Sequence, residues 1–288
     1  MEKLPWWPEN TSRSNLLHEI DQYCKAQGSA SYNEDFSRWT AIQSIIPHQS
    51  KALIAIDAIL YSALDEGCIQ DAFLTKHELG VLEAIFTNAS SEDIVASSRK
   101  LELLCRHMRA LKYMLYSGHN VITVKIIMET HHIMMMDDEY GGSFRSGPVY
   151  GGNFQYLSSD QIPSSMESSL ESHNDRVRMK SMDPIDLAAK LFYDIVHRIH
   201  PFQDGNGRIG RLIVSYVLMS SSLTSFALPF NDRTTKSRKH YEKAISYFSR
   251  LEKPYSMLSL YILDCTHKCW NNYYINIHPH DQQTFQCH

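Results

Sequence analysis

Apolar residues recur at intervals of three and four along most of this chain, which is the spacing that one buried face of an α-helix requires. The clearest segment spans residues 185–199, where Asp183 offers an N-cap and Pro184 suits the first helical position. Turn-forming residues at 204–207 end that helix, and helical spacing resumes after Arg208. The same pattern predicts helices at residues 14–24, 51–65, 75–85, 92–116, 121–136, 208–219, 235–250 and 254–274.

Two of these segments have further local signals. Thr75 and Glu78 form a capping-box pattern that predicts the start of the helix at 75–85. The segment at 121–136 is rich in Val and Ile, which suits a strand, but its length favours a helix.

Composition excludes several classes of protein. The chain has 288 residues, 43% of them apolar, so one large domain with a sizeable core is expected. A net charge of −4 leaves no broad basic surface for nucleic acid. The first residues lack the apolar run of a signal peptide, and no window is long and apolar enough to span a bilayer. We therefore expect no membrane contact and mostly reduced cysteines in a cytoplasmic protein, while a nuclear location stays open.

The chemistry concentrates in residues 200–211, which read HPFQDGNGRIGR. His200 can accept a proton near neutral pH, and Asp204 is the hard oxygen ligand that a magnesium–phosphate complex prefers. A glycine-rich turn followed by a helix start presents backbone N–H groups to an anion. Arg208 and Arg211 suit phosphate through paired hydrogen bonds. Each feature has an ordinary explanation when taken alone: a packed histidine, a plain turn or two solvated arginines. Their coincidence in twelve residues predicts a polyphosphate site with a metal and a base.

This block resembles the signature of the Fic family, His-x-Phe-x-Asp/Glu-Gly-Asn-Gly-Arg-x-x-Arg, with every defined position filled. The resemblance implies an all-α fold and transfer of AMP from ATP to a Ser, Thr or Tyr hydroxyl of a target protein. It makes His200 the base, Asp204 the ligand of Mg²⁺ or Mn²⁺, and Phe202 a core anchor. The ATP-binding positions that it implies in this block are Asp204, Gly205, Asn206, Gly207, Arg208, Ile209, Gly210 and Arg211.

A second resemblance lies at the end of the helix predicted at 51–65. Residues 62–67, SALDEG, are similar to the Ser/Thr-x-x-x-Glu-Gly/Asn pattern of the Fic inhibitory helix, which would span 51–67. The resemblance implies that Glu66 pairs with Arg211 and displaces a phosphate of ATP, with Ser62 and Gly67 as flanking members of the element. The alternative is an ordinary helix end, with Gly67 in the left-handed conformation.

Two further regions resemble Fic elements. Residues 142–152 are similar to the Fic flap, a short β-hairpin over the active site that holds a target by strand addition. Phe144, Arg145 and Val149 are its flap residues, and Gly151 and Gly152 would let the nucleotide approach; an ordinary glycine-rich hairpin is the alternative. Tyr241 lies where the family places aromatics near adenine, although a plain position on an amphipathic helix explains it as well.

The chain then divides into a polar arm at residues 1–40, a helical region at 41–118, a Fic core at 119–275 and a tail at 276–288. Gly207 and Gly205 argue against the Fic variants that transfer phosphate or phosphocholine. Transfer of UMP stays open, as does a nucleotide-binding regulatory module without turnover. The resemblance also implies that Glu66 could assist removal of AMP from a modified target. Neither the target nor the oligomeric state, with a homodimer among the options, is encoded in a readable pattern.

Overall fold

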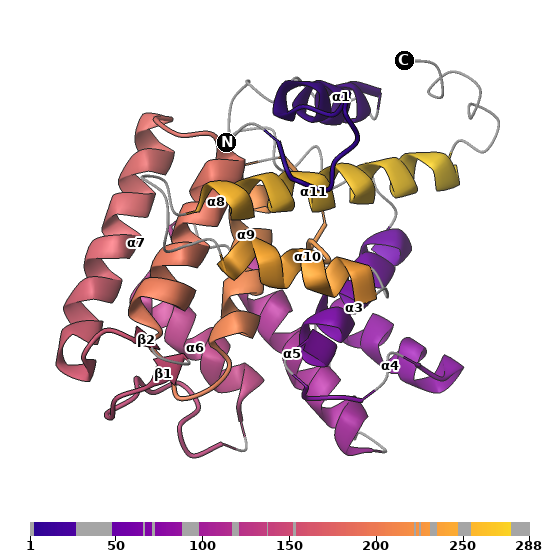
Figure 1. The fold of residues 1–288 in the computed structure, drawn as a ribbon. Helices are drawn as coiled ribbons and strands as arrows, with labels where there is room; N and C mark the ends of the chain where they lie inside the picture. The colour runs from indigo at the N-terminus through magenta and orange to yellow at the C-terminus, as the bar shows by residue number, and fades with distance from the viewer. Residues whose placement is uncertain are drawn as a thin grey trace.

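The protein has an all-α fold in which one short β-hairpin is the exception (Figure 1). The computed structural model describes residues 3–26, 48–65, 67–70, 73–87, 98–116, 121–136, 138–151, 154–221, 223–224, 226–230, 235–246 and 255–277. Its elements are α1 (Arg13–Ala26), α3 (His48–Asp65), α4 (Lys76–Thr87), α5 (Arg99–Tyr116), α6 (Val124–Met134), β1 (Tyr150–Gly151), β2 (Phe154–Gln155), η2 (Ser159–Gln161), α7 (Ile162–Met179), α8 (Pro184–Phe192), η3 (Tyr193–Ile199), α9 (Asn206–Ser220), α10 (Thr235–Ser246) and α11 (Ser256–Ile277). The all-α prediction is confirmed.

Helix α9 lies at the centre of the fold and is buried along almost its whole length. It packs against α8 on one side and against α5 and α3 on another, while α6 pairs with α5 (Figure 1). Helix α11 covers α8 and carries α10 beside it. Within the described ranges, no helix combines the length and apolar character that a bilayer span needs.

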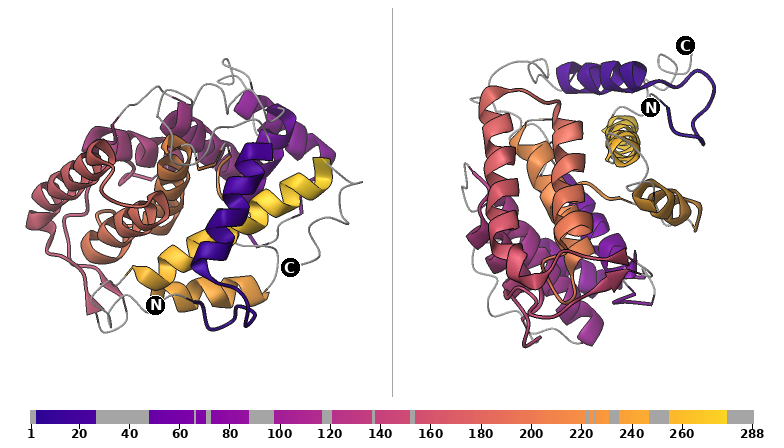
Figure 2. Two further views of the ribbon diagram at one scale, coloured as in Figure 1. Left: turned by 90° about the horizontal axis from the view of Figure 1, so that it is seen from above. Right: turned by 60° about the vertical axis from the view of Figure 1, so that its left-hand side comes forward.

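The N-terminal arm docks on the helical core through its apolar positions. Figure 2 shows α1 crossing over α11, and Leu4, Leu16 and Ile20 are buried there. The indole N–H of Trp7 donates to Asp264 Oδ1 in α11 at 3.0 Å. Arg13 adds a hydrogen bond and ion pair to Asp183 at 3.1 Å.

The predicted helix boundaries agree with the structure where a capping group sets them. Thr75 Oγ1 accepts from the N–H of Glu78 at 3.2 Å, and the Glu78 carboxylate accepts from the N–H of Thr75 at 2.8 Å, which confirms the capping box. Asp183 caps α8 by accepting from the N–H of Ile185 at 2.9 Å. The predicted helix at 185–199 divides, however, because its last seven residues form the π-helix η3.

Helix α7 is absent from the sequence-based prediction. Its 18 residues are rich in Ser and polar on average, although one face of the helix is buried. The buried positions are Ile162, Met166, Ser169, Leu170 and His173, which share one helical face. Serine and histidine occupy two places on that face, so the apolar spacing was too incomplete to predict a helix.

The docking of the arm predicts a large effect of Trp7 on stability. We expect Trp7→Ala to lower the free energy of unfolding by about 3 kcal/mol, because it empties a buried site and removes the donor to Asp264 Oδ1, while Lys268 stays bonded to Oδ2. Trp7→Phe keeps most of the burial and should cost about 1 kcal/mol. Urea denaturation measures both. Met179→Ala, at an exposed apolar position, is the control and should change stability by less than about 0.5 kcal/mol. Equal stability of Trp7→Ala and wild type would show that the arm is not part of the cooperative fold.

Candidate active site

His200 ends the π-helix η3 in a left-handed backbone conformation, with φ 53° and ψ 62°. Its N–H donates to the carbonyl of Ile195 at 2.8 Å, five residues back, which is the π-type bond. A non-glycine residue at positive φ is uncommon and persists only where its surroundings hold it.

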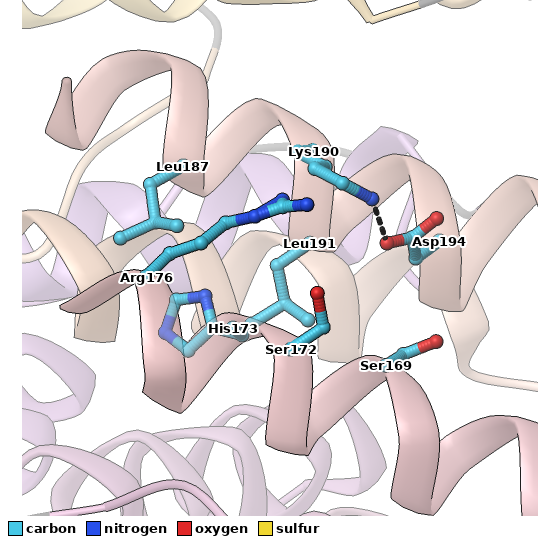
Figure 3. A pocket seen from close by; sticks show the side chains of 8 residues that line it. All are labelled: Ser169, Ser172, His173, Arg176, Leu187, Lys190, Leu191 and Asp194. Atoms are coloured by element: carbon cyan, nitrogen blue, oxygen red, sulfur yellow. Dashed lines mark hydrogen bonds and ion pairs between the residues drawn. The ribbon is translucent and has the colours of Figure 1, made fainter. Parts of the chain in front are cut away.

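Asp194 fixes the π-helix from the side. Its carboxylate contacts Lys190 Nζ at 2.5 Å and Arg198 Nε at 3.1 Å, and Arg198 also donates to Ser169 Oγ in α7 at 2.7 Å. Figure 3 shows the hollow between α7 and α8 in which Lys190 reaches Asp194. These bonds tie the last turns before His200 to a neighbouring helix.

The tautomer of His200 follows from its hydrogen bond. Nδ1 lies 2.7 Å from the carbonyl oxygen of Val196. A carbonyl oxygen can only accept, so Nδ1 carries the hydrogen and the neutral ring keeps its lone pair on Nε2. That lone pair is what a general base needs.

Arg145 clamps the backbone on both sides of this histidine. The side chain is only 4% exposed, and burial lowers the pKa of its guanidinium. Its donors reach the carbonyl oxygens of His200 at 2.7 Å, Gly147 at 2.7 Å, Ile199 at 3.3 Å and Leu157. The predicted flap residue is therefore an interior group that joins the flap to the base.

The loop after His200 is closed by Asn206. Its side chain accepts from the N–H of Phe202 at 3.0 Å and donates to the carbonyl of Phe202 at 2.8 Å. Phe202 is fully buried, as a core anchor should be. Gly205 has φ 78°, and a Cβ there would lie 3.1 Å from His131 Nε2, so both the backbone and the space favour glycine.

His131 holds this loop from α6, and sequence reasoning missed it. The N–H of Gly142 donates to His131 Nδ1 at 2.9 Å, so Nε2 must carry the hydrogen that it donates to the carbonyl of Asp204 at 3.0 Å. The ring stacks on Phe202 with centroids 3.7 Å apart. Burial is the main cause that lowers the pKa of His131 to about 4, in keeping with a ring that accepts at one nitrogen. Only its place in an apolar helix was visible in the sequence.

Helix α9 begins at Asn206 and brings the two arginines inside the protein. Arg208 and Arg211 are both 4% exposed. Arg208 pairs with Asp204 at 3.1 Å. The predicted ATP-binding positions Ile209 and Gly210 face the helix packing instead: Ile209 is fully buried, and a Cβ at Gly210 would clash with Val196 of η3 and Phe192 of α8. Their side chains therefore serve packing, which the motif match did not reveal.

Three buried polar atoms beside α9 have no hydrogen-bond partner in the described structure. They are Nε of Arg208 and both ring nitrogens of His107 in α5. Burial, then the charges of Arg208 and Arg211, hold the pKa of His107 well below its usual value, so the ring is neutral. Leaving buried polar atoms unpaired is costly, and an oxyanion such as a phosphate could accept from Arg208 Nε and from the single N–H of the neutral His107 ring.

Asp204 suits a metal that arrives with phosphates. Its side chain is 62% exposed, with one oxygen accepting from the N–H of Gly205 at 2.6 Å and the other paired with Arg208. In the part of the chain that the structure describes, no cluster of three or more His, Cys, Asp or Glu residues could hold a metal by itself. Mg²⁺ commonly binds through one carboxylate and substrate phosphates, so the donor set fits it.

Arg211 meets the end of α3. Its Nε donates to Ser62 Oγ at 2.8 Å and its Nη2 to the Ser62 carbonyl at 3.2 Å. Its Nη1 donates to the hydroxyl of Tyr241 at 3.1 Å, so this tyrosine lies against the guanidinium. Gly67 has φ 70° after the helix end. Glu66 lies outside the described residues.

The flap is a hairpin of β1 and β2, paired antiparallel with Tyr150 opposite Gln155 and Gly151 opposite Phe154. Val149 precedes β1 rather than lying in it, but its carbonyl accepts from the N–H of Tyr156 at 3.1 Å and extends the pairing. Gly152 lies outside the described residues.

Residues 121–218, which contain this site except for its groups from α3, α5 and α10, match the Fic/DOC family. This segment is therefore similar to Fic domains. Protein adenylyltransferase fic-1 of Caenorhabditis briggsae is 32% identical over 122 residues, which are 42% of this chain and 24% of that protein. Protein adenylyltransferase Fic of Drosophila ananassae is 32% identical over 156 residues, 53% of this chain and 29% of that protein. The matched stretches thus span less than a third of these relatives.

Solved Fic structures share the fold of this domain. A Fic domain containing signaling protein from Bacteroides thetaiotaomicron superposes with a TM-score of 0.64 at 21% identity, covering 89% of this chain and 95% of that one. A segment of Fic-1 from Caenorhabditis elegans gives a TM-score of 0.65 at 19% identity, covering 92% and 72%. The likeness extends beyond residues 121–218 to most of the helical framework.

The neutral state of His131 predicts a pH dependence of stability. The folded protein keeps this ring neutral down to about pH 4, whereas an unfolded chain protonates it near pH 6.5. The contribution of neutral His131 to the free energy of unfolding is therefore complete above pH 6.5 and falls as the pH drops toward 4. We expect His131→Gln to cost about 2 kcal/mol at pH 7.5 and to flatten the loss of stability between pH 6.5 and 4.

Urea denaturation at several pH values measures both effects. The exposed neighbour His132 is the control, and His132→Gln should keep the wild-type slope. The slope will not vanish in His131→Gln, because burial also lowers the pKa of His173 to about 4. A slope identical to that of the wild type would contradict the assignment.

Proposed function

We propose that this Fic domain transfers AMP from ATP to a hydroxyl group of a target protein. The observation that carries the proposal is the tautomer of His200, whose Nδ1 is committed to the Val196 carbonyl and whose Nε2 is left to accept a proton. The names of the curated relatives support the same activity.

The reaction makes one bond and breaks one. The acceptor hydroxyl oxygen attacks the α-phosphorus of ATP, its proton passes to His200 Nε2, and the bond to pyrophosphate breaks. Arg208, Arg211 and the start of α9 hold the phosphates, and neutral His107 adds a donor beside them. Mg²⁺ held by Asp204 would neutralise phosphate charge. The chain contributes chiefly position and fixed charge.

We further propose that α3 restrains this activity. Ser62 already binds Arg211 with both its hydroxyl and its carbonyl. Glu66 follows Ser62 by four positions in the sequence. A carboxylate there would compete with a phosphate of ATP for the Arg211 guanidinium.

Labelled nucleotides test the activity. Wild type, Glu66→Gly and Glu66→Gly/His200→Ala are incubated with Mg²⁺ and α-labelled ATP, CTP, GTP or UTP, alone and with a cell lysate. We expect label from ATP alone, at least about tenfold more in Glu66→Gly than in wild type, and a loss of about a hundredfold or more without His200.

Each other outcome corrects a different part of the proposal. Label from UTP would keep the mechanism and change the donor. Label of equal amount in wild type and Glu66→Gly would reject the restraint. An absence of label from all four nucleotides would favour a binding module without turnover. Release of AMP from the labelled protein by wild type, but not by Glu66→Gly, would show that the reverse reaction uses Glu66.

Ser62 provides a second test of the restraint. Ser62→Ala removes an acceptor from the buried Arg211 guanidinium, so α3 should hold the arginine less tightly and transfer should rise about fivefold to tenfold. In the Glu66→Gly background the same substitution should change transfer by less than about twofold, because the restraint is already gone. Rates of label incorporation measure both. A rise of equal size in the two backgrounds would show that Ser62 acts on Arg211 independently of Glu66.

A further inference from the structure

The ring of Tyr156 lies flat on the imidazole of His200. The two centroids are 3.9 Å apart and the planes differ by 16°. Tyr156 directly follows β2, so the end of the flap hairpin touches the base. The motif at 200–211 does not include this residue, and nothing in its sequence surroundings marked it.

The hairpin sets where this ring lies. The N–H of Tyr156 donates to the carbonyl of Val149 at 3.1 Å, one position beyond the pairing of Tyr150 with Gln155. The Tyr156 ring also lies close over Gly151, where an added Cβ would be 2.8 Å from the hydroxyl oxygen and 3.3 Å from two ring carbons. The position of the Tyr156 ring therefore depends on the pairing of β1 with β2 and on the absence of a side chain at Gly151.

The same bonds that fix His200 also fix the residue after Tyr156. Arg145 donates to the carbonyls of both Leu157 and His200. The backbones that carry the two rings are thus joined through one guanidinium. The stack is built into the site rather than left to two independent side chains.

Each contact on His200 restricts a different motion of the imidazole ring. The bond from Nδ1 to Val196 fixes one edge of the ring, and the Tyr156 face prevents the ring from tilting off that bond. When Nε2 takes a proton, the ring becomes a cation beneath an aromatic face, which attracts it. Burial raises the pKa of the Tyr156 hydroxyl, so the phenol stays neutral and does not compete as a base.

We propose that Tyr156 is a positioning residue for the general base, which holds the His200 imidazole so that Nε2 faces the acceptor hydroxyl and couples the flap to proton transfer. This inference rests on the proposed function for its kinetic consequence, but the geometry that it asserts can be measured without turnover.

Kinetics in the Glu66→Gly background test the consequence. Tyr156→Leu should lower kcat about tenfold to a hundredfold while KM for ATP changes by less than about twofold, because the phosphate site is untouched. Tyr156→Phe keeps the stacked ring and should restore kcat to within about threefold of the parent. Tyr140→Leu, at an exposed tyrosine before the hairpin, is the matched control and should change neither constant.

Nitrogen-15 spectra of the histidine side chains test the geometry itself. In wild type, His200 should give the pattern of a ring with hydrogen on Nδ1 and a lone pair on Nε2. Tyr156→Leu should give averaged shifts of a ring that moves between tautomers, and Tyr156→Phe should keep the wild-type pattern. Should Tyr156→Leu fail to fold, Tyr156→Met, which keeps more of the side-chain volume, takes its place in both experiments.

The two experiments separate the inference from the proposed function. If no variant transfers any nucleotide but the His200 spectrum changes as expected, the proposed activity fails and the positioning role stands. If the His200 spectrum in Tyr156→Leu equals that of wild type, the positioning role is overturned. The positioning role is likewise overturned if kcat of Tyr156→Leu lies within threefold of the parent. Faster transfer by Tyr156→Leu would also overturn it, because the tyrosine ring would then be blocking access of the acceptor hydroxyl.

Discussion

The site depends on a buried guanidinium that is neutralised by no carboxylate in the described structure and is satisfied by carbonyl oxygens. Burying a charge is costly unless every donor is bonded, so Arg145 can exist only where several backbone segments converge on it. Those segments are the start of the flap, its end, and the turn at His200. The requirement works in both directions, because the strained conformation of His200 persists only while its carbonyl is held.

Local electrostatics then outweigh the global charge. The chain carries a net charge of −4, so no long-range field draws a polyphosphate anion to the site. Arg208 and Arg211 are both almost fully buried, where a guanidinium interacts with a phosphate more strongly than it would in water. Burial of Arg211 requires partners from other helices, and this is why α3 and α10 take part in a site whose motif lies elsewhere in the chain.

Sequence reasoning identified the residues whose type and spacing define their role. It missed the residues that matter because they hold another residue in place. The caps at Thr75 and Asp183 and the fully filled motif were readable because residue type and spacing alone define them. The roles of His131 and Tyr156 were not, since a histidine in an apolar helix and a tyrosine after a hairpin are common. Their significance comes from neighbours 73 and 44 residues away in sequence. The π-helix was equally hidden, because its apolar spacing matches that of an α-helix over two turns.

The hairpin is closed at its base by a single side chain. Arg145 binds the carbonyls of Gly147 and Leu157, so both ends of the segment between them are fastened at the same point. A loop whose ends are held together changes its length at little entropic cost. The residues between Gly147 and Leu157 can therefore vary in number and type without displacing the backbone that Arg145 holds. Variation at the rim of the site is thereby separated from the backbone that holds His200.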